Sequence, residues 1–226
     1  MTEPSFTGQS EQLRRGHFIR VINYHSTPRG ARDELGAELA RYARDYAAVT
    51  LDDLDQLFET GTWHKDKPGL IPVFYEGYRN SATVSAPLCD ELGLTGWFPI
   101  ATSFVDCGPQ YQEAFARAHW ISLVEEDTQG GRIAMNWDEV HELSRRHVIY
   151  PHTANHEGFD TVLSEADLRR EVIESKRQLD AVTGQSAPAF VWLHGSSYGQ
   201  SPRHDAVVKS AGYRYQFANT MIHRIN

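Results

Sequence analysis

The sequence contains few cysteines and no long apolar stretch. Only Cys89 and Cys107 occur among its 226 residues, so neither a disulfide framework nor a cysteine-based zinc site is expected. No apolar run reaches the roughly 18 uncharged residues that a membrane helix needs. The polar residues 1–16 also lack the apolar core of a secretory signal. These absences predict a cytoplasmic protein without a membrane span.

Positive charge is scarce as well. Twenty-two Lys and Arg residues face 30 Asp and Glu residues, which gives a formal net charge of -8. Contacts to phosphate groups depend on clustered Lys and Arg. The balance therefore argues against general binding to nucleic acids or anionic membranes, while the oligomeric state cannot be read from the sequence.

Length and composition favour one globular domain. The chain has 40% hydrophobic and 23% charged residues, and 226 residues suffice for one full-sized core. We predict a flexible lead-in over residues 1–16, rich in Ser, Thr, Gln and Glu, and a single domain over residues 17–226.

Apolar periodicity predicts an alternation of strands and helices. Alternation of this kind indicates a parallel sheet, as either a barrel or an open doubly wound sheet, with the active site at the carboxyl ends of the strands. The expected strands cover residues 18–24, 70–75, 96–100, 147–151, 189–193 and 213–217, and the expected helices cover 34–46, 51–58, 81–92, 111–123, 137–146, 164–182 and 201–212.

Polar side chains gather where these strands end. His152 and His156 follow one strand and are four positions apart, so a helical turn would place both imidazoles on one face. Glu76 ends another strand and is the best third ligand. Two histidines and a carboxylate form a common open site for zinc or a similar divalent ion. Because the chain holds 11 histidines, a chance spacing between ordinary histidines is the competing interpretation.

Other candidate ligands have simpler explanations. The hydroxyl of Thr50 can cap a helix whose first turn contains Asp52 and Asp53, and acidic side chains stabilise that end of a helix. His119 lies one turn after Phe115 in an expected helix, which favours packing over metal binding. We therefore leave these residues out of the site.

The order of the motifs resembles the polysaccharide deacetylases of the NodB homology domain, carbohydrate esterase family 4. That resemblance implies an incomplete or distorted (β/α)7-type barrel and a divalent metal, zinc or else cobalt or manganese. It also implies a hydrolase of amide C–N bonds that acts on a saccharide or small-molecule substrate. The family's His-(Ser/Thr)-x-x-His motif matches residues 152–156 at every defined position, and the further similar segments are 21–25, 73–78, 136–140 and 212–213.

The sequence departs from the family at the catalytic positions. Family enzymes usually read Thr-Phe-Asp-Asp-Gly, with a base followed by a metal ligand, whereas Tyr75 and Glu76 stand here. A tyrosine has an ordinary pKa of about 10 and is not a carboxylate base. The arginine of a later motif is replaced in the segment before His194, and His223 is only a weak counterpart of the family's general acid.

Two functions remain open on these residues. In the first, the metal activates water with little help from a base, and His25 or His194 transfers the proton; the substrate is then an acetylated amino sugar or, as in allantoinase-like relatives, a cyclic amide. In the second, the site binds a carbohydrate or partner without turnover. Tyr24, Trp192 and Tyr198 are the predicted stacking residues for a saccharide ring.

Overall fold

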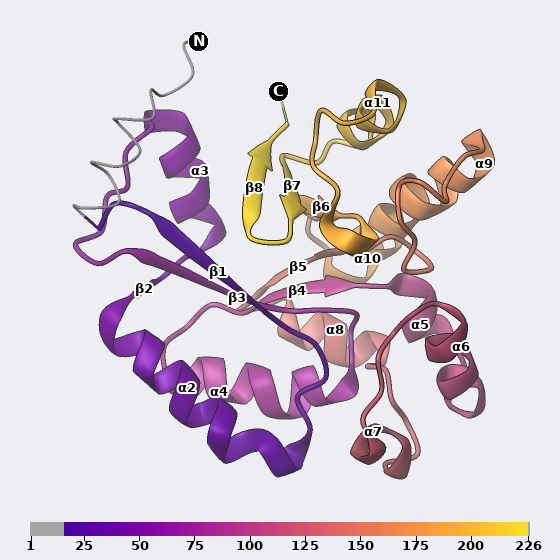
Figure 1. The fold of residues 1–226 in the computed structure, drawn as a ribbon, viewed down its shortest axis with the longest axis horizontal. Helices are drawn as coiled ribbons and strands as arrows, with labels where there is room; N and C mark the ends of the chain where they lie inside the picture. The colour runs from indigo at the N-terminus through magenta and orange to yellow at the C-terminus, as the bar shows by residue number, and fades with distance from the viewer. Residues whose placement is uncertain (1–15, 226) are drawn as a thin grey trace.

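Helices and strands alternate along the chain in the computed structural model, which describes residues 16–225 (Figure 1). All but the last residue of the predicted lead-in therefore lies outside the described residues. The strands are β1 (Ile19–Tyr24), β2 (Ala47–Ala48), β3 (Gly69–Phe74), β4 (Trp97–Ile100), β5 (Val148–Pro151), β6 (Ala189–Val191), β7 (Tyr215–Ala218) and β8 (Met221–Arg224). The α-helices are α2 (Arg32–Asp45), α3 (Leu51–Thr60), α4 (Ala86–Glu91), α5 (Thr102–Asp106), α6 (Gln112–Ala118), α7 (Glu125–Gln129), α8 (Trp137–Leu143), α9 (Glu165–Leu168), α10 (Ser175–Thr183) and α11 (Pro202–Ser210).

The strands form two sheets. The first has the order β1-β3-β4-β5, with short β2 added to β3, and every pairing in it is parallel. The second has the order β6-β7-β8, in which β6 and β7 are parallel and β7 and β8 antiparallel. Side chains of β5 and β6 share one core, so the second sheet continues the curve of the first. The fold is a distorted, incomplete (β/α) barrel, as predicted.

The outer face of the first sheet is covered by helices. Figure 1 shows α2 and α4 running along β1 and β3. Leu39 on α2 and Leu88 on α4 pack against Phe74 and Phe98 of the sheet. The burial of these apolar side chains removes them from water, which is the main force that holds helix and sheet together.

The inner face of the strands forms a second core. Because successive side chains of a strand point to opposite sides, Val73 and Tyr75 lie inside together with Tyr150, and Phe74 lies outside. Inside they meet Trp97 of β4 and side chains of β6 and β7. At the carboxyl ends of the strands, the same alternation decides which side chains face inward.

Helix α3 packs against the inner core. Leu54 of α3 is fully buried in that core, and Asp55 accepts a hydrogen bond of 2.6 Å from the hydroxyl of Tyr215 on β7. Thr50 caps the helix reciprocally with Asp53. The sequence-based assignment of this Asp-rich segment to a helix start is confirmed.

Several elements differ from the predicted ones. The long helix after Ser164 consists of α9, a π-helical stretch (Arg169–Glu174) and α10, while a second π-helical stretch (Ser81–Ser85) leads into α4. Four strands or α-helices of the described residues were not expected: β2, α5, α7 and the final strand β8. Asn219 adopts a positive φ of 54° in the turn before β8, and Asn tolerates this conformation better than most residues.

Candidate metal centre

The loop that follows β5 brings both histidines of the motif into one buried site. Thr153 and His156 have positive φ values of 59° and 60°, so residues 152–156 form tight turns and not the expected helical turn. The two imidazole rings are perpendicular, with centroids 4.6 Å apart. The rings therefore converge through backbone turns, and helical stacking is the wrong explanation for their proximity.

Glu76 approaches the histidines from the end of β3. Its backbone is left-handed, with φ of 67°, and Gly77 follows with φ of 93°, so the chain turns sharply and directs the carboxylate inward. Ligand atoms of Glu76, His152 and His156 all lie within 4.8 Å of one another. The structure thus brings together the three side chains selected from the sequence as metal ligands.

Each imidazole is oriented by a backbone carbonyl. Nδ1 of His152 donates to the carbonyl of Val191 at 3.2 Å, and Nδ1 of His156 donates to the carbonyl of His119 at 2.6 Å. A proton on Nδ1 leaves the lone pair of Nε2 free, which is the usual arrangement in histidine metal ligands. His119 itself stacks on Phe115, in agreement with its predicted packing role, and contributes to the site through its backbone.

An unsatisfied buried atom tests whether a metal fits. Nε2 of His156 is buried and has no hydrogen-bond partner among the described residues; it lies 3.5 Å from Oε1 of Glu76. Buried polar atoms nearly always have a partner. A divalent cation would satisfy this nitrogen and the facing carboxylate at once, so the residues present fit a metal ion.

The charge states also suit a cation. Burial opposes ionisation of Glu76, but the neighbouring imidazoles of His156 and His25 outweigh it and hold the pKa of this carboxyl below its usual value. Burial, reinforced by the neighbouring His156, lowers the pKa of His152 to about 3. An ionised carboxylate and a neutral imidazole are the states in which these groups bind metals.

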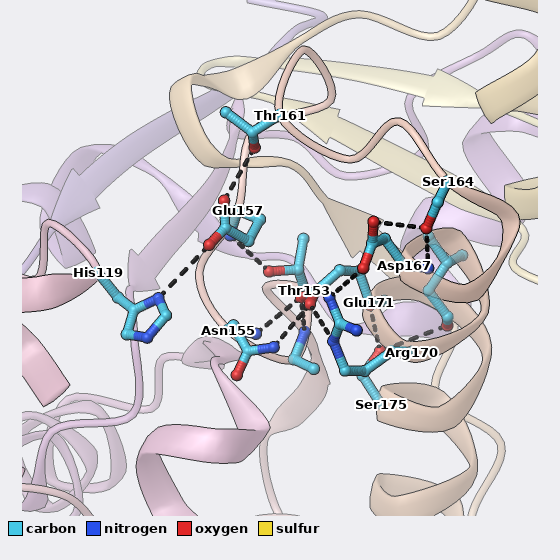
Figure 2. A network of polar contacts seen from close by, with 12 residues as sticks. His119, Thr153, Asn155, Glu157, Thr161, Ser164, Asp167, Arg170, Glu171 and Ser175 are labelled. Atoms are coloured by element: carbon cyan, nitrogen blue, oxygen red, sulfur yellow. Dashed lines mark hydrogen bonds and ion pairs between the residues drawn. The ribbon is translucent and has the colours of Figure 1, made fainter.

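Glu171 holds the histidine loop in place, as Figure 2 shows. Its fully buried carboxylate accepts hydrogen bonds from the backbone amides of Ala154 and Asn155 at 2.9 and 2.8 Å, and from the Asn155 side chain at 2.7 Å. Arg170 adds an ion pair at 2.9 Å. The sequence analysis missed this residue because it lies in a helix that looks ordinary in sequence.

His25, which follows β1, also contacts Glu76. Its Nδ1 lies 2.9 and 3.0 Å from the two carboxylate oxygens, and 61% of its side chain is exposed. Hydrogen bonding with Glu76 raises the pKa of His25. His194 also lines the cavity, in an exposed position with φ of 66°. Both predicted proton-transfer residues are therefore at the site.

Tyr75 occupies the position of the family's base. Its ring packs between His25 and His152, with centroid distances of 5.6 and 5.2 Å. Burial and the nearby Glu76 raise the pKa of its hydroxyl, which is buried without a hydrogen-bond partner among the described residues. Tyr75 therefore shapes the inner wall of the site and remains protonated at neutral pH.

Of the three predicted stacking residues, only Trp192 lines the cavity, and it is buried there. Tyr24 packs on Phe74 and hydrogen-bonds to Glu38, because alternation along β1 turns it toward α2. The ring of Trp192 is only 2% exposed and contacts Phe190 and His204. Tyr198 and His223 do not line the cavity. Alternation along β1 was the signal that could have excluded Tyr24.

A cavity of about 290 Å³ opens above the three candidate ligands. It extends the site toward residues that the sequence analysis did not select. They are Asn23 of β1, Trp120 and Ser122 of the segment after α6, and Gly195 and Asn219 near β6 and β7. The β4–β5 connection thus contributes part of the wall.

Comparison with known proteins identifies the class of this fold. Residues 128–216 match the family model described as polysaccharide deacetylase. Over these residues the chain resembles the polysaccharide deacetylases, in agreement with the resemblance drawn from its sequence motifs. Members of this family are hydrolases of amide C–N bonds. A search of curated proteins gives no match.

Solved structures of deacetylases share the fold across most of the chain. A de-N-acetylase from Aggregatibacter actinomycetemcomitans has 17% identity and a TM-score of 0.67, with 92% of this chain and 91% of that chain covered. IcaB from Ammonifex degensii has 16% identity and a TM-score of 0.65, with 91% and 88% covered. The Streptococcus pyogenes deacetylase PplD has 13% identity and a TM-score of 0.65, with 86% and 80% covered. Within residues 16–225, no helix has the length and apolar character needed to cross a membrane.

Proposed function

We propose that this chain is a metal-dependent deacetylase that removes the acetyl group from an amino sugar or a related small amide. One observation carries the proposal: Glu76, His152 and His156 converge in a buried site, and both Nδ1 atoms are held by backbone carbonyls. A chance group of histidines would not be expected to have both Nδ1 atoms held by backbone carbonyls beside one buried carboxylate.

The ligand set suits zinc, with cobalt or manganese as alternatives. A divalent ion bound there supplies a Lewis acid that polarises the amide carbonyl and activates water. Glu76, His152 and His156 would hold it. The choice of metal and a cytoplasmic location remain predictions from the sequence.

Side chains at the cavity rim carry out the remaining proton transfer. Nδ1 of His25 is hydrogen-bonded to Glu76. Nε2 is therefore the ring atom that carries a proton to the departing amine. The exposure of His25 allows that proton to exchange with water. His194, which lines the same cavity, is the alternative donor. Tyr75 orients His25 by stacking and does not accept the proton itself.

A second function, saccharide binding without turnover, is favoured by one observation. Tyr75 fills the position of the catalytic base with a buried, unpartnered hydroxyl, and general-base catalysis is typically worth about 10²–10⁴-fold in rate. A site without that base would keep its metal and its ligand while losing most of its turnover. Hydrolysis of a cyclic amide is the remaining alternative within the same chemistry.

The functions are separated by metal content and product release. Purified protein is stripped, reloaded with zinc, cobalt or manganese, and analysed for bound metal. It is then assayed for acetate release from N-acetylglucosamine oligomers and for opening of cyclic amides such as hydantoin. The proposal expects one bound ion and acetate release. Failure to bind any of the three metals rejects it, and ring opening without acetate release favours the cyclic amide hydrolase.

The variant Tyr75→Asp separates a slow enzyme from a non-catalytic binder. If the wild-type protein binds metal but releases acetate only after Tyr75→Asp, the binding function is correct. If both proteins release acetate and the variant is faster, the chain is an enzyme that works without a carboxylate base. Tyr75→Phe is the matched control, because it removes the hydroxyl and keeps the ring that stacks on His25.

A further inference from the structure

Trp120 is unusual among the tryptophans of this protein. Its side chain is 80% exposed, the largest value among the exposed large hydrophobic residues of the described chain, while Trp63, Trp97 and Trp192 are buried. Trp120 also lines the cavity above the candidate metal ligands. A large apolar ring that is exposed to water beside a polar site indicates that a ligand covers it.

The backbone of Trp120 is in a conformation that favours glycine. Trp120 follows the C-terminus of α6 with φ of 59°, and the amide of Ile121 donates to the carbonyl of Ala116 at 2.9 Å. This is the 6→1 hydrogen bond of a Schellman motif, whose left-handed position is usually glycine. A tryptophan there is conformationally strained, so helix termination does not explain the side chain.

The residues on both sides of Trp120 are fixed. The carbonyl of His119 accepts the Nδ1 proton of the candidate ligand His156. Ile121 is buried, and the carbonyl of Ser122 accepts a hydrogen bond from Tyr78. The backbone of Trp120 is therefore held beside the candidate metal centre, and its ring lines the cavity.

We propose that Trp120 is the platform on which a pyranose ring of the substrate stacks at the mouth of the site. The apolar C–H face of a pyranose covers an indole ring, while its hydroxyl groups remain in water or reach polar atoms of the cavity. Tyr24 and Tyr198 do not line the cavity, and Trp192 lines it but is only 2% exposed, so Trp120 is the exposed tryptophan of the cavity wall. The inference rests on the proposed function for the reacting group, and it makes a saccharide the substrate class.

The test measures binding separately from turnover. Metal-free, full-length protein is titrated with N-acetylglucosamine tetramer by calorimetry, and with the metal-loaded protein KM and kcat for acetate release are measured. Trp120→Ala is expected to weaken tetramer binding by about 10-fold and to raise KM more than it lowers kcat. Trp120→Phe should recover part of the affinity. Tyr111→Ala, which removes an exposed aromatic ring outside the cavity, is the matched control and should bind like the wild type.

Trp120→Gly adds a readout that a structural role would not produce. Glycine relieves the left-handed strain, so this variant should unfold at a higher temperature than Trp120→Ala and still bind the tetramer about 10-fold more weakly than the wild type. Lower stability of Trp120→Gly than of Trp120→Ala contradicts the inference.

The outcomes distinguish this inference from the proposed function. Trp120-dependent binding of the tetramer without acetate release supports the stacking role and rejects the deacetylase. Acetate release with the same KM in wild type and Trp120→Ala supports the deacetylase and rejects the stacking role. Absence of tetramer binding to the wild-type protein also rejects the stacking role, and an exposed contact for another protein then becomes the better explanation of Trp120.

Discussion

Strand β5 has a buried histidine at each end, and the two differ in how their rings are hydrogen-bonded. At its amino end, Nδ1 of His147 accepts a hydrogen bond of 3.2 Å from the amide of Gly96. At its carboxyl end, Nδ1 of His152 donates to the carbonyl of Val191. Burial lowers the pKa of both rings. Two buried histidines that flank the same strand are thus held in opposite tautomers.

The tautomer decides what each histidine can do. A ring that accepts at Nδ1 carries its proton on Nε2, which in His147 faces Asp90 at 3.6 Å. That ring has no free lone pair and serves the packing of β4 against β5. A ring that donates at Nδ1 has its Nε2 lone pair free for a metal. The comparison shows that burial and residue type alone do not identify a metal ligand.

The largest difference is expected when each histidine is replaced in turn. His152→Gln removes a ligand from the buried site and should weaken zinc binding by more than ~100-fold. His147→Gln keeps an acceptor for the Gly96 amide and should leave zinc affinity unchanged. Metal content after dialysis against a competing chelator measures both. Equal metal binding in wild type and His152→Gln would show that the ligands were chosen wrongly.

A smaller but still clear effect on stability and metal affinity is expected when Glu171, which supports the histidine loop, is replaced. Glu171→Gln replaces one carboxylate oxygen, a hydrogen-bond acceptor for the loop, by an amide NH2 group and removes the negative charge. We expect the free energy of unfolding to fall by about 2–3 kcal/mol and the metal affinity to fall ~10-fold. Urea denaturation and metal competition measure the two effects.

The control for this prediction lies on the same helix. Glu174→Gln breaks an exposed ion pair with Arg169, and pairs of this kind are worth at most about 1 kcal/mol. If both variants lose the same stability, Glu171 is no more than an ordinary helix residue and the loop has another support.

The smallest effect concerns pH. Burial keeps the folded-state pKa of His147 below that of the unfolded chain, so the unfolded state takes up a proton first as the pH falls below about 6.5. The stability from the neutral ring is complete above that pH and is lost as the pH falls toward the folded-state pKa. Urea denaturation at pH 8 and pH 5 should therefore show a smaller stability loss for His147→Gln than for the wild type. An identical loss in both proteins would contradict the role assigned to His147.

The sequence by itself determined the fold class and the most specific part of the site. Alternating strands and helices indicated the parallel arrangement, and residues 152–156 marked the histidine motif. Local patterns were read correctly where local interactions decide the structure. Thr50 caps α3 as its place before the Asp-rich turn predicted, because a cap depends only on residues within one turn.

Only the tertiary structure decided which side chains surround that motif. Strand alternation states that Tyr24 and His25 point to opposite sides, but the curvature of the sheet decides which side is the cavity, and it placed Tyr24 against α2. Glu171 lies in a helix and Trp120 follows α6, and the two are distant in sequence. Their roles are visible only in the fold, where Glu171 contacts the histidine loop and Trp120 lines the cavity. Such contacts depend on packing between distant segments, which no local pattern encodes.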